Sequence, residues 1–181
     1  MIAELTGMDL ANSSMYDGPT ALAEAAMMSA GQTKKKTILV SKAVHPEARA
    51  VIQANANGQR LDVIEIETKD GVTDLEQLKK SFNEETACVV VQYPNFFGNL
   101  EPMAELEQIT HSEKSLFVVS SNPLALGLLK SPGEFGADIV VGDAQPFGIP
   151  TQFGGPHCGY FATTKKTDAK SSWSSCRSND G

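Results

Sequence analysis

The sequence has no surplus of basic charge. Its 181 residues include 15 lysines and arginines against 22 acidic residues, which gives a net charge of −7. Proteins that bind nucleic acid use a basic surface to neutralise phosphates and release their counterions. We therefore expect no nucleic-acid partner.

The sequence is also poor in cysteine and contains no long apolar run. Its three cysteines, Cys88, Cys158 and Cys176, are odd in number and lack the paired spacing of a disulfide framework or a zinc site. No apolar run approaches the roughly 20 residues of a membrane-spanning helix. The first ten residues, MIAELTGMDL, carry acids and no basic segment, unlike a signal peptide. We expect a cytoplasmic chain with no metal and no membrane contact.

Several catalytic and nucleotide-binding motifs are missing. There is no G-x-G-x-x-G, no Walker lysine motif and no G-x-S-x-G, which argues against dinucleotide, P-loop and α/β-hydrolase sites. His157 follows a Gly-Gly-Pro run, and no acid or second histidine stands at ligand spacing from it. We expect a structural or hydrogen-bonding role for His157, with metal binding or general-base chemistry as the alternatives.

What is present is an alternation of two hydrophobic periods. Short β-branched runs predict strands, and the segments between them predict helices with Thr73 or Asp74 as one N-cap and Gly58 as one stop. Such alternation implies parallel strands joined by right-handed crossovers, hence a three-layer α/β/α sandwich with a mainly parallel sheet. The predicted strands are 37–42, 61–67, 87–92, 116–121 and 138–143, and the predicted helices are 45–58, 73–82 and 101–111.

The run YDGPTALAEAAMM (16–28) predicts a turn at Asp17-Gly18 and a helix that begins at Pro19. A helix N-terminus beside a strand end is a ready anion site, because its first N–H groups are free. Asp17 has the wrong charge for that role, although a carboxylate caps a helix well. The run therefore has the shape of an anion cradle with an acid at its mouth.

Three long stretches resemble the P-protein family of the glycine cleavage system, the glycine dehydrogenase (decarboxylating). They are ELTGMDLANSSMYDGPTALAEAAMM, VVVQYPNFFGNLE and SSNPLALGLLKSPGEFGADIVVGDAQPFGIPTQFGGPHCGYFAT, and the resemblance runs over residues 1–166. The form of the SMYDG segment is similar to subunit 1 of the two-subunit bacterial type. The resemblance implies the large domain of a fold type I pyridoxal-phosphate enzyme. It also implies glycine decarboxylation, with transfer of the aminomethyl group to the lipoyl arm of the H-protein.

The resemblance also implies that this chain lacks its own cofactor. Gln145 falls at the position of the Schiff-base lysine, and an amide cannot form an imine. Ser120 or Ser121 falls where an acid should face the pyridine nitrogen. We therefore expect no catalytic residue of this chain's own, and pyridoxal 5′-phosphate bound by the partner, subunit 2, in a heterotetramer.

Fold type I sites lie at dimer interfaces, so a non-catalytic half can still present loops to its partner's site. Our candidates for that face, which could equally hold a degenerate site in shape, are Ser14, Tyr16, Asp17, Gln152, Gly154, Gly155 and His157.

Two other functions remain open. An autonomous pyridoxal-phosphate enzyme would need another lysine, and Lys42 and Lys130 are the candidates. A non-enzymatic module would only dock the H-protein. The last residues, 167–181, do not resemble the family, and we expect that tail to be disordered or an out-of-frame artefact; the chain as a whole is expected to be a fragment that is inactive alone.

Overall fold

The computed structural model describes residues 1–12 and 14–168. The expectation for the tail therefore lies almost wholly outside the described residues. The helices are α1 (Ile2–Thr6), α2 (Gly18–Thr33), α3 (Pro46–Gln59), α4 (Leu75–Ser81), α5 (Met103–His111) and α6 (Lys165–Asp168). The strands are β1 (Leu10–Ala11), β2 (Thr37–Ser41), β3 (Asp62–Ile66), β4 (Thr68–Lys69), β5 (Val72–Thr73), β6 (Thr86–Tyr93), β7 (Leu116–Ser121), β8 (Ile139–Asp143) and β9 (Gly159–Thr163).

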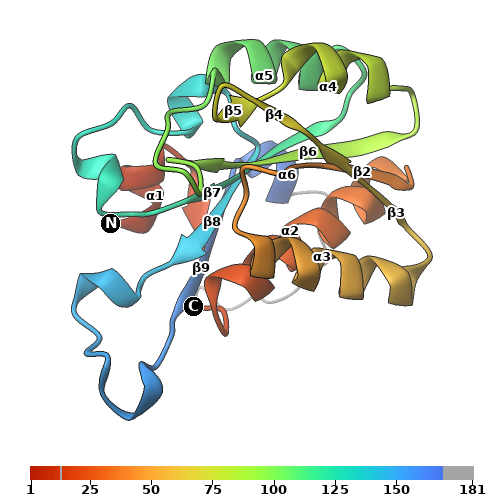
Figure 1. The fold of residues 1–181 in the computed structure, drawn as a ribbon. Coiled ribbons are helices and arrows are strands. Elements are labelled where there is room, and N and C mark those ends of the chain that lie inside the picture. The colour runs from red at the N-terminus through yellow and green to blue at the C-terminus, as the bar shows by residue number, and fades with distance from the viewer. Residues whose placement is uncertain (13, 169–181) are drawn as a thin grey trace, which may run out of the picture.

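The strands form a seven-stranded sheet in the order β1-β9-β8-β7-β6-β2-β3, beside a small β4-β5 hairpin. The β3-β2-β6-β7-β8 part is parallel, whereas β9 pairs antiparallel with both β8 and β1. Helices cover both faces (Figure 1), and the predicted three-layer α/β/α sandwich with a mainly parallel sheet is confirmed.

The two cores follow from the alternation of side chains along each strand. Along β7, Val118 faces α2 and α3, whereas Phe117 and Val119 face α4 and α5. Strands that are buried on both faces read as continuous apolar runs, as predicted for β6, β7 and β8. The alanine-rich stretch of α2 is explained by burial, since Ala21, Ala25 and Ala26 are fully inaccessible between the sheet and α3.

One predicted helix end is confirmed, and another needs a small correction. Asp74, not Thr73, caps α4, and its carboxylate accepts the N–H groups of Glu76 and Gln77. The α3 helix passes Gly58 and ends at Gln59, with Arg60 in the left-handed conformation. Three 3₁₀ turns follow β7 and β8 at Ala125–Gly127, Gly133–Phe135 and Gln145–Phe147, and a fourth lies at Gln152–Gly154.

Candidate functional site

The carboxyl end of β8 and the N-terminus of α2 meet at one carboxylate, Asp143. Because Ile139 and Val141 pack in the core on the α2 side of the sheet, the alternation along β8 places Asp143 on that same side. Its Oδ2 accepts a hydrogen bond from the Gly18 N–H at 3.4 Å and lies 2.6 Å from His157 Nδ1. Its Oδ1 accepts from the N–H groups of Gln145 at 2.8 Å and Cys158 at 3.5 Å. One side chain thus connects three segments.

Backbone contacts bring these segments together. Gly159 exchanges two hydrogen bonds with Met15, at 2.7 and 2.9 Å. A Cβ at Gly159 would lie 2.4 Å from the Asp17 carbonyl oxygen, and one at Gly142 would lie 2.2 Å from that of Ser121. Only glycine permits such close approach.

At the N-terminal end of α2, which we call its mouth, groups of the chain itself accept the N–H groups of the first turn. Asp17 is the N-cap, as predicted, and its Oδ1 accepts the Thr20 N–H at 2.7 Å. The Asp17 carbonyl accepts the Ala21 N–H at 3.0 Å, Pro19 has no N–H, and Asp143 takes the Gly18 N–H. Within the described residues, every N–H of the first turn therefore has a partner.

A pyridoxal phosphate does not fit this mouth. A phosphate would find no unused N–H donor in the first turn and would meet two carboxylates, Asp17 and Asp143, at a helix end that otherwise favours anions. Burial raises the pKa of Asp143, but its bonds with Gln145, His157, Cys158 and Gly18 outweigh that effect and leave the pKa below its ordinary value. Asp143 is therefore an anion, and it occupies the place that an anionic ligand would need.

The residues expected at the other cofactor positions, and the two alternative lysines, have the following contacts. Gln145, at the expected lysine position, is held by its backbone to Asp143. Ser121 at the end of β7 is buried, and its Oγ has no hydrogen-bond partner among the described residues. Lys42 pairs with Glu67 at 2.5 Å, beside β3, and Lys130 lies 4.4 Å from the centre of the Phe135 ring on the opposite face from α2.

The predicted face residues are only partly gathered. His157 contacts Asp143 directly, whereas Asp17 is linked to it only as the neighbour of Gly18, whose N–H Asp143 accepts. Tyr16, 83% exposed, and Ser14 lie on the surface. The loop between β8 and β9 extends away from the body of the molecule at the lower left of Figure 1, and it carries Gln152 and Gly154 outward. Gly155 is buried against Gln145, because a Cβ there would lie 2.9 Å from Gln145 Nε2.

Asp143 itself was missed by the sequence analysis. No acid stands at ligand spacing from His157, and Asp143 lies 14 residues away in the chain. The antiparallel pairing of Asp143 with Gly159 brings the two together. The acid that ends a buried strand just before a glycine-rich loop is the signal that could have indicated it.

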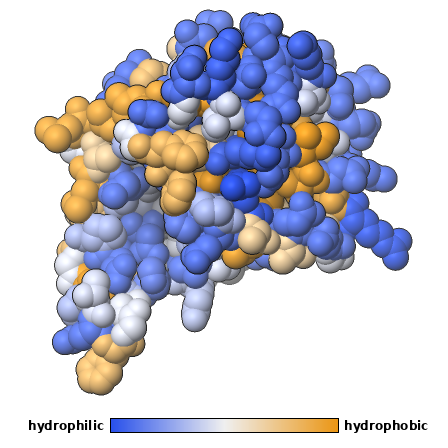
Figure 2. Space-filling view, viewed as in Figure 1, coloured by the Kyte–Doolittle hydropathy of each residue, from blue (hydrophilic) through white to orange (hydrophobic). Residues whose placement is uncertain are grey.

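A rim of apolar side chains surrounds this edge of the sheet. Figure 2 shows hydrophobic atoms on the left of the molecule, around the loops after β6 and β7, and at the tip of the β8–β9 loop. Eight of the ten large exposed hydrophobic side chains in the described part of the chain belong to segments that follow β6, β7 or β8, or lead into α2. We call them the carboxyl-edge rim: Tyr16, Phe96, Phe97, Leu100, Leu124, Leu128, Phe147 and Phe153.

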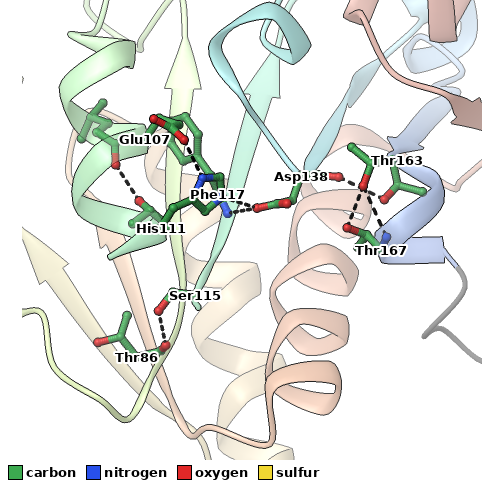
Figure 3. A network of polar contacts seen from close by, with 11 residues as sticks. Thr86, Glu107, His111, Ser115, Phe117, Asp138, Thr163 and Thr167 are labelled. Atoms are coloured by element: carbon green, nitrogen blue, oxygen red, sulfur yellow. Dashed lines mark hydrogen bonds and ion pairs between the residues drawn. The ribbon is translucent and has the colours of Figure 1, made fainter. Parts of the chain in front are cut away.

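A second histidine cluster lies at the opposite, amino edge of the sheet. His111 at the end of α5 lies between Glu107 and Asp138, with Nδ1 2.6 Å from one carboxylate and Nε2 2.8 Å from the other (Figure 3). Asp138 also accepts the Phe117 N–H at 2.8 Å. The Asp138 bond, opposed by partial burial and helped by Glu107, raises the pKa of His111 to about 9.

Among the described residues, no group of three or more histidines, cysteines and acids is placed to hold a metal ion. In the same part of the chain, no helix has the length and apolar character needed to cross a bilayer.

The chain has the α/β fold that is also found in fold type I pyridoxal-phosphate enzymes. A NifS-like protein superposes with a TM-score of 0.72 at 16% identity, covering 92% of this chain and 46% of that one. A putative O-acetylhomoserine (thiol)-lyase from Campylobacter jejuni, whose structure contains a pyridoxyl-lysine phosphate, gives 0.71 at 14% identity, covering 99% and 40%. At these identities the likeness concerns the fold alone.

The family model for the glycine cleavage system P-protein matches residues 1–171, so the chain belongs to that family. The probable glycine dehydrogenase (decarboxylating) subunit 1 of Halalkalibacterium halodurans is 77% identical over 166 residues, and that of Bacillus cytotoxicus is 70% identical over 165. A glycine decarboxylase (P-protein) crystal structure in inhibitor-bound form superposes with a TM-score of 0.88 at 45% identity, covering 93% of this chain and 38% of that one.

The chain spans 37% of the length of these curated relatives, while they align with 92% and 91% of it. The relatives are therefore longer proteins, of which this chain matches one part.

Proposed function

We propose that this chain is part of subunit 1 of a glycine decarboxylase and that it holds no cofactor of its own. The lack of a cofactor is inferred from the N-terminus of α2, where Asp17 and Asp143 accept the N–H groups that a phosphate would need. Family membership and 77% identity to a probable subunit 1 support the first half. In this proposal pyridoxal 5′-phosphate belongs to subunit 2, and the aminomethyl acceptor is the lipoylated H-protein.

The carboxyl-edge rim supports a partner at this edge. Exposed large apolar side chains gather at this edge, and ligands of open α/β sheets bind beyond the carboxyl ends of the strands. We propose that subunit 2 covers the rim and that Ser14, Tyr16, Asp17 and the 152–157 loop face its site.

The direct test mixes the complete subunit 1 with subunit 2, cofactor and H-protein and measures exchange of the glycine carboxyl group with bicarbonate. We expect exchange only when both subunits are present, and cofactor absorbance only in samples that contain subunit 2. Exchange by subunit 2 and H-protein alone at the full rate would refute the proposal.

The autonomous alternative predicts a lysine that forms an imine in this chain. Lys42 pairs with Glu67 and Lys130 lies over Phe135, so we expect borohydride reduction with cofactor to label neither. A cofactor-modified peptide that contains either lysine would favour the alternative.

The docking-module alternative predicts that H-protein binds without subunit 2. A pull-down of lipoylated H-protein by this chain alone distinguishes it, and we expect no capture. The cytoplasmic location also remains a prediction, which cell fractionation tests.

A further inference from the structure

His157 retains one free ring nitrogen after the helix mouth has been filled. Its Nδ1 lies 2.6 Å from Asp143 Oδ2, and its side chain is half exposed. The structure assigns no hydrogen-bond partner to Nε2 among the described residues. The ring thus has one nitrogen held by a carboxylate and the other open.

Asp143 fixes which nitrogen carries the proton. An ionised carboxylate can only accept, so the Nδ1 of neutral His157 must be the N–H donor, and Nε2 carries the lone pair. The carboxylate cannot swing away easily, because the N–H groups of Gln145, Cys158 and Gly18 also hold it. A carboxylate that orients an imidazole and stabilises its charged form is the arrangement by which enzymes prepare a histidine for proton transfer.

The other two histidines of the chain lack this combination. Both nitrogens of His111 face carboxylates, at the amino edge. His45 lies at the carboxyl edge, but its Nδ1 accepts the Glu47 N–H and its ring packs edge-on against Phe96. Among the described contacts, His157 alone combines a carboxylate-held nitrogen with one that has no hydrogen-bond partner in residues 1–12 and 14–168.

The position of His157 supports a shared site. It lies at the edge of the sheet that carries the apolar rim, where we propose that subunit 2 binds. The charged group that contacts its ring is Asp143 from β8, 2.6 Å from Nδ1. Because Asp143 holds Nδ1, Nε2 is the ring atom at which a proton can be exchanged.

We propose that His157 is a proton-transfer residue which this chain contributes to the glycine site of the assembled enzyme, with Asp143 as its positioning residue. The inference rests on the proposed function. Nε2 accepts a proton from the ammonium group of glycine: the N–H bond breaks, its electron pair stays on the glycine nitrogen, and an Nε2–H bond forms. The imidazolium then releases this proton to water, while Asp143 remains ionised throughout.

The test uses the complete subunit 1, in this numbering, assembled with subunit 2 and H-protein. We expect His157→Gln to lower kcat about 100-fold or more and to remove the acid limb of its pH profile. The KM for glycine should change little. The matched control, His111→Gln, makes the same substitution at the amino edge, away from the site, and its kcat should stay within about twofold of the wild type.

Two measurements separate proton transfer from a structural role. Added imidazole should restore part of the kcat of His157→Ala, which a purely structural histidine would not allow. In ¹⁵N-histidine NMR, neutral His157 should carry its proton on Nδ1. Asp143→Asn should move that proton to Nε2, because the amide then donates to Nδ1, and kcat should fall as for His157→Gln.

The outcomes distinguish the inference from the proposed function. If the wild-type assembly shows no glycine exchange, the proposed function fails, whatever the tautomer. If the wild type is active but His157→Gln keeps its kcat and acid limb, only the inference fails. A proton on Nε2 in the wild type, or a loss of pairing with subunit 2 that accounts for the lost activity, would also overturn the inference.

Discussion

Two histidines with carboxylate partners lie at opposite edges of the same sheet, and their surroundings differ. At the amino edge His111 is held from both sides, by Glu107 and Asp138 (Figure 3). At the carboxyl edge His157 is held from one side, and half of its side chain is exposed. Each histidine contacts an aspartate, and His111 contacts a glutamate as well.

The difference concerns what each carboxylate stabilises. Asp138 joins α5 to β7, because its Oδ2 meets His111 and the Phe117 N–H. Asp143 joins the start of α2 to the end of the β8–β9 loop. At the amino edge both ring nitrogens of His111 are used in contacts within the fold. At the carboxyl edge one ring nitrogen of His157 remains available among the described residues. A histidine–carboxylate pair thus stabilises the fold when its second ring nitrogen is also bonded, and is a candidate for proton transfer when that nitrogen is open.

The largest expected effect on stability comes from Asp138. Asp138→Ala should lower the free energy of unfolding by about 3 kcal/mol, because it leaves the Phe117 N–H without an acceptor and His111 with one carboxylate. Urea denaturation at neutral pH measures the loss. Asp138→Asn keeps an acceptor and should lose less; equal losses in the two variants would contradict the assigned role.

The contribution of His111 to the free energy of unfolding should depend on pH. Its pKa rises from 6.5 to about 9 in the folded chain, so its contribution is complete below pH 6.5 and is lost as the pH rises through 9. His111→Gln should therefore cost about 2 kcal/mol at slightly acidic pH and progressively less as the pH increases. Denaturation of both proteins across this range measures the difference, and a constant difference would refute the charged pair.

The carboxyl edge should respond on the acid side instead. The pKa of Asp143 lies below its ordinary value of 3.8, so its contribution is present above that value and is lost as the pH falls through the lowered one. Asp143→Asn should therefore cost about 1.5 kcal/mol at neutral pH and little in strong acid. Acid titrations of unfolding for the two proteins measure the effect; a cost that persists undiminished in strong acid would contradict it.

The cap of α2 tests the filled helix mouth. Asp17→Ala should cost about 1 kcal/mol, since the Thr20 N–H loses its acceptor. Asp17→Asn can still cap and should be nearly neutral. Thermal unfolding compares them, and equal stability of the alanine variant and the wild type would indicate that the cap is dispensable.

The smallest effect on stability should come from the rim. Phe153 is completely exposed, so Phe153→Ser should change the free energy of unfolding by less than about 0.5 kcal/mol. The same change should reduce self-association of the chain in light scattering, because it removes apolar surface. Unchanged self-association would show that the apolar side chain of Phe153 does not contribute to it.

Much of the fold followed from local pattern. The β-branched runs at 116–121 and 138–143 became β7 and β8, and Asp17 became the predicted cap of α2. These features depend on neighbours within a turn or a strand, so the sequence shows them directly. The antiparallel strand β9 did not appear as a prediction, because its pairing with β8 and β1 involves residues far apart in the chain.

The sequence by itself determined the layered α/β class, the amide at Gln145 and the acid at the mouth of α2, since these depend on periodicity and on the identity of single residues. Only the tertiary structure decided that Asp143 and His157 form a pair, because a turn of chain and an antiparallel ladder must fold before they meet. It also decided that every N–H at the α2 mouth within the described residues has a partner. Hydrogen bonds act over about 3 Å, and no sequence spacing specifies such a distance between remote segments.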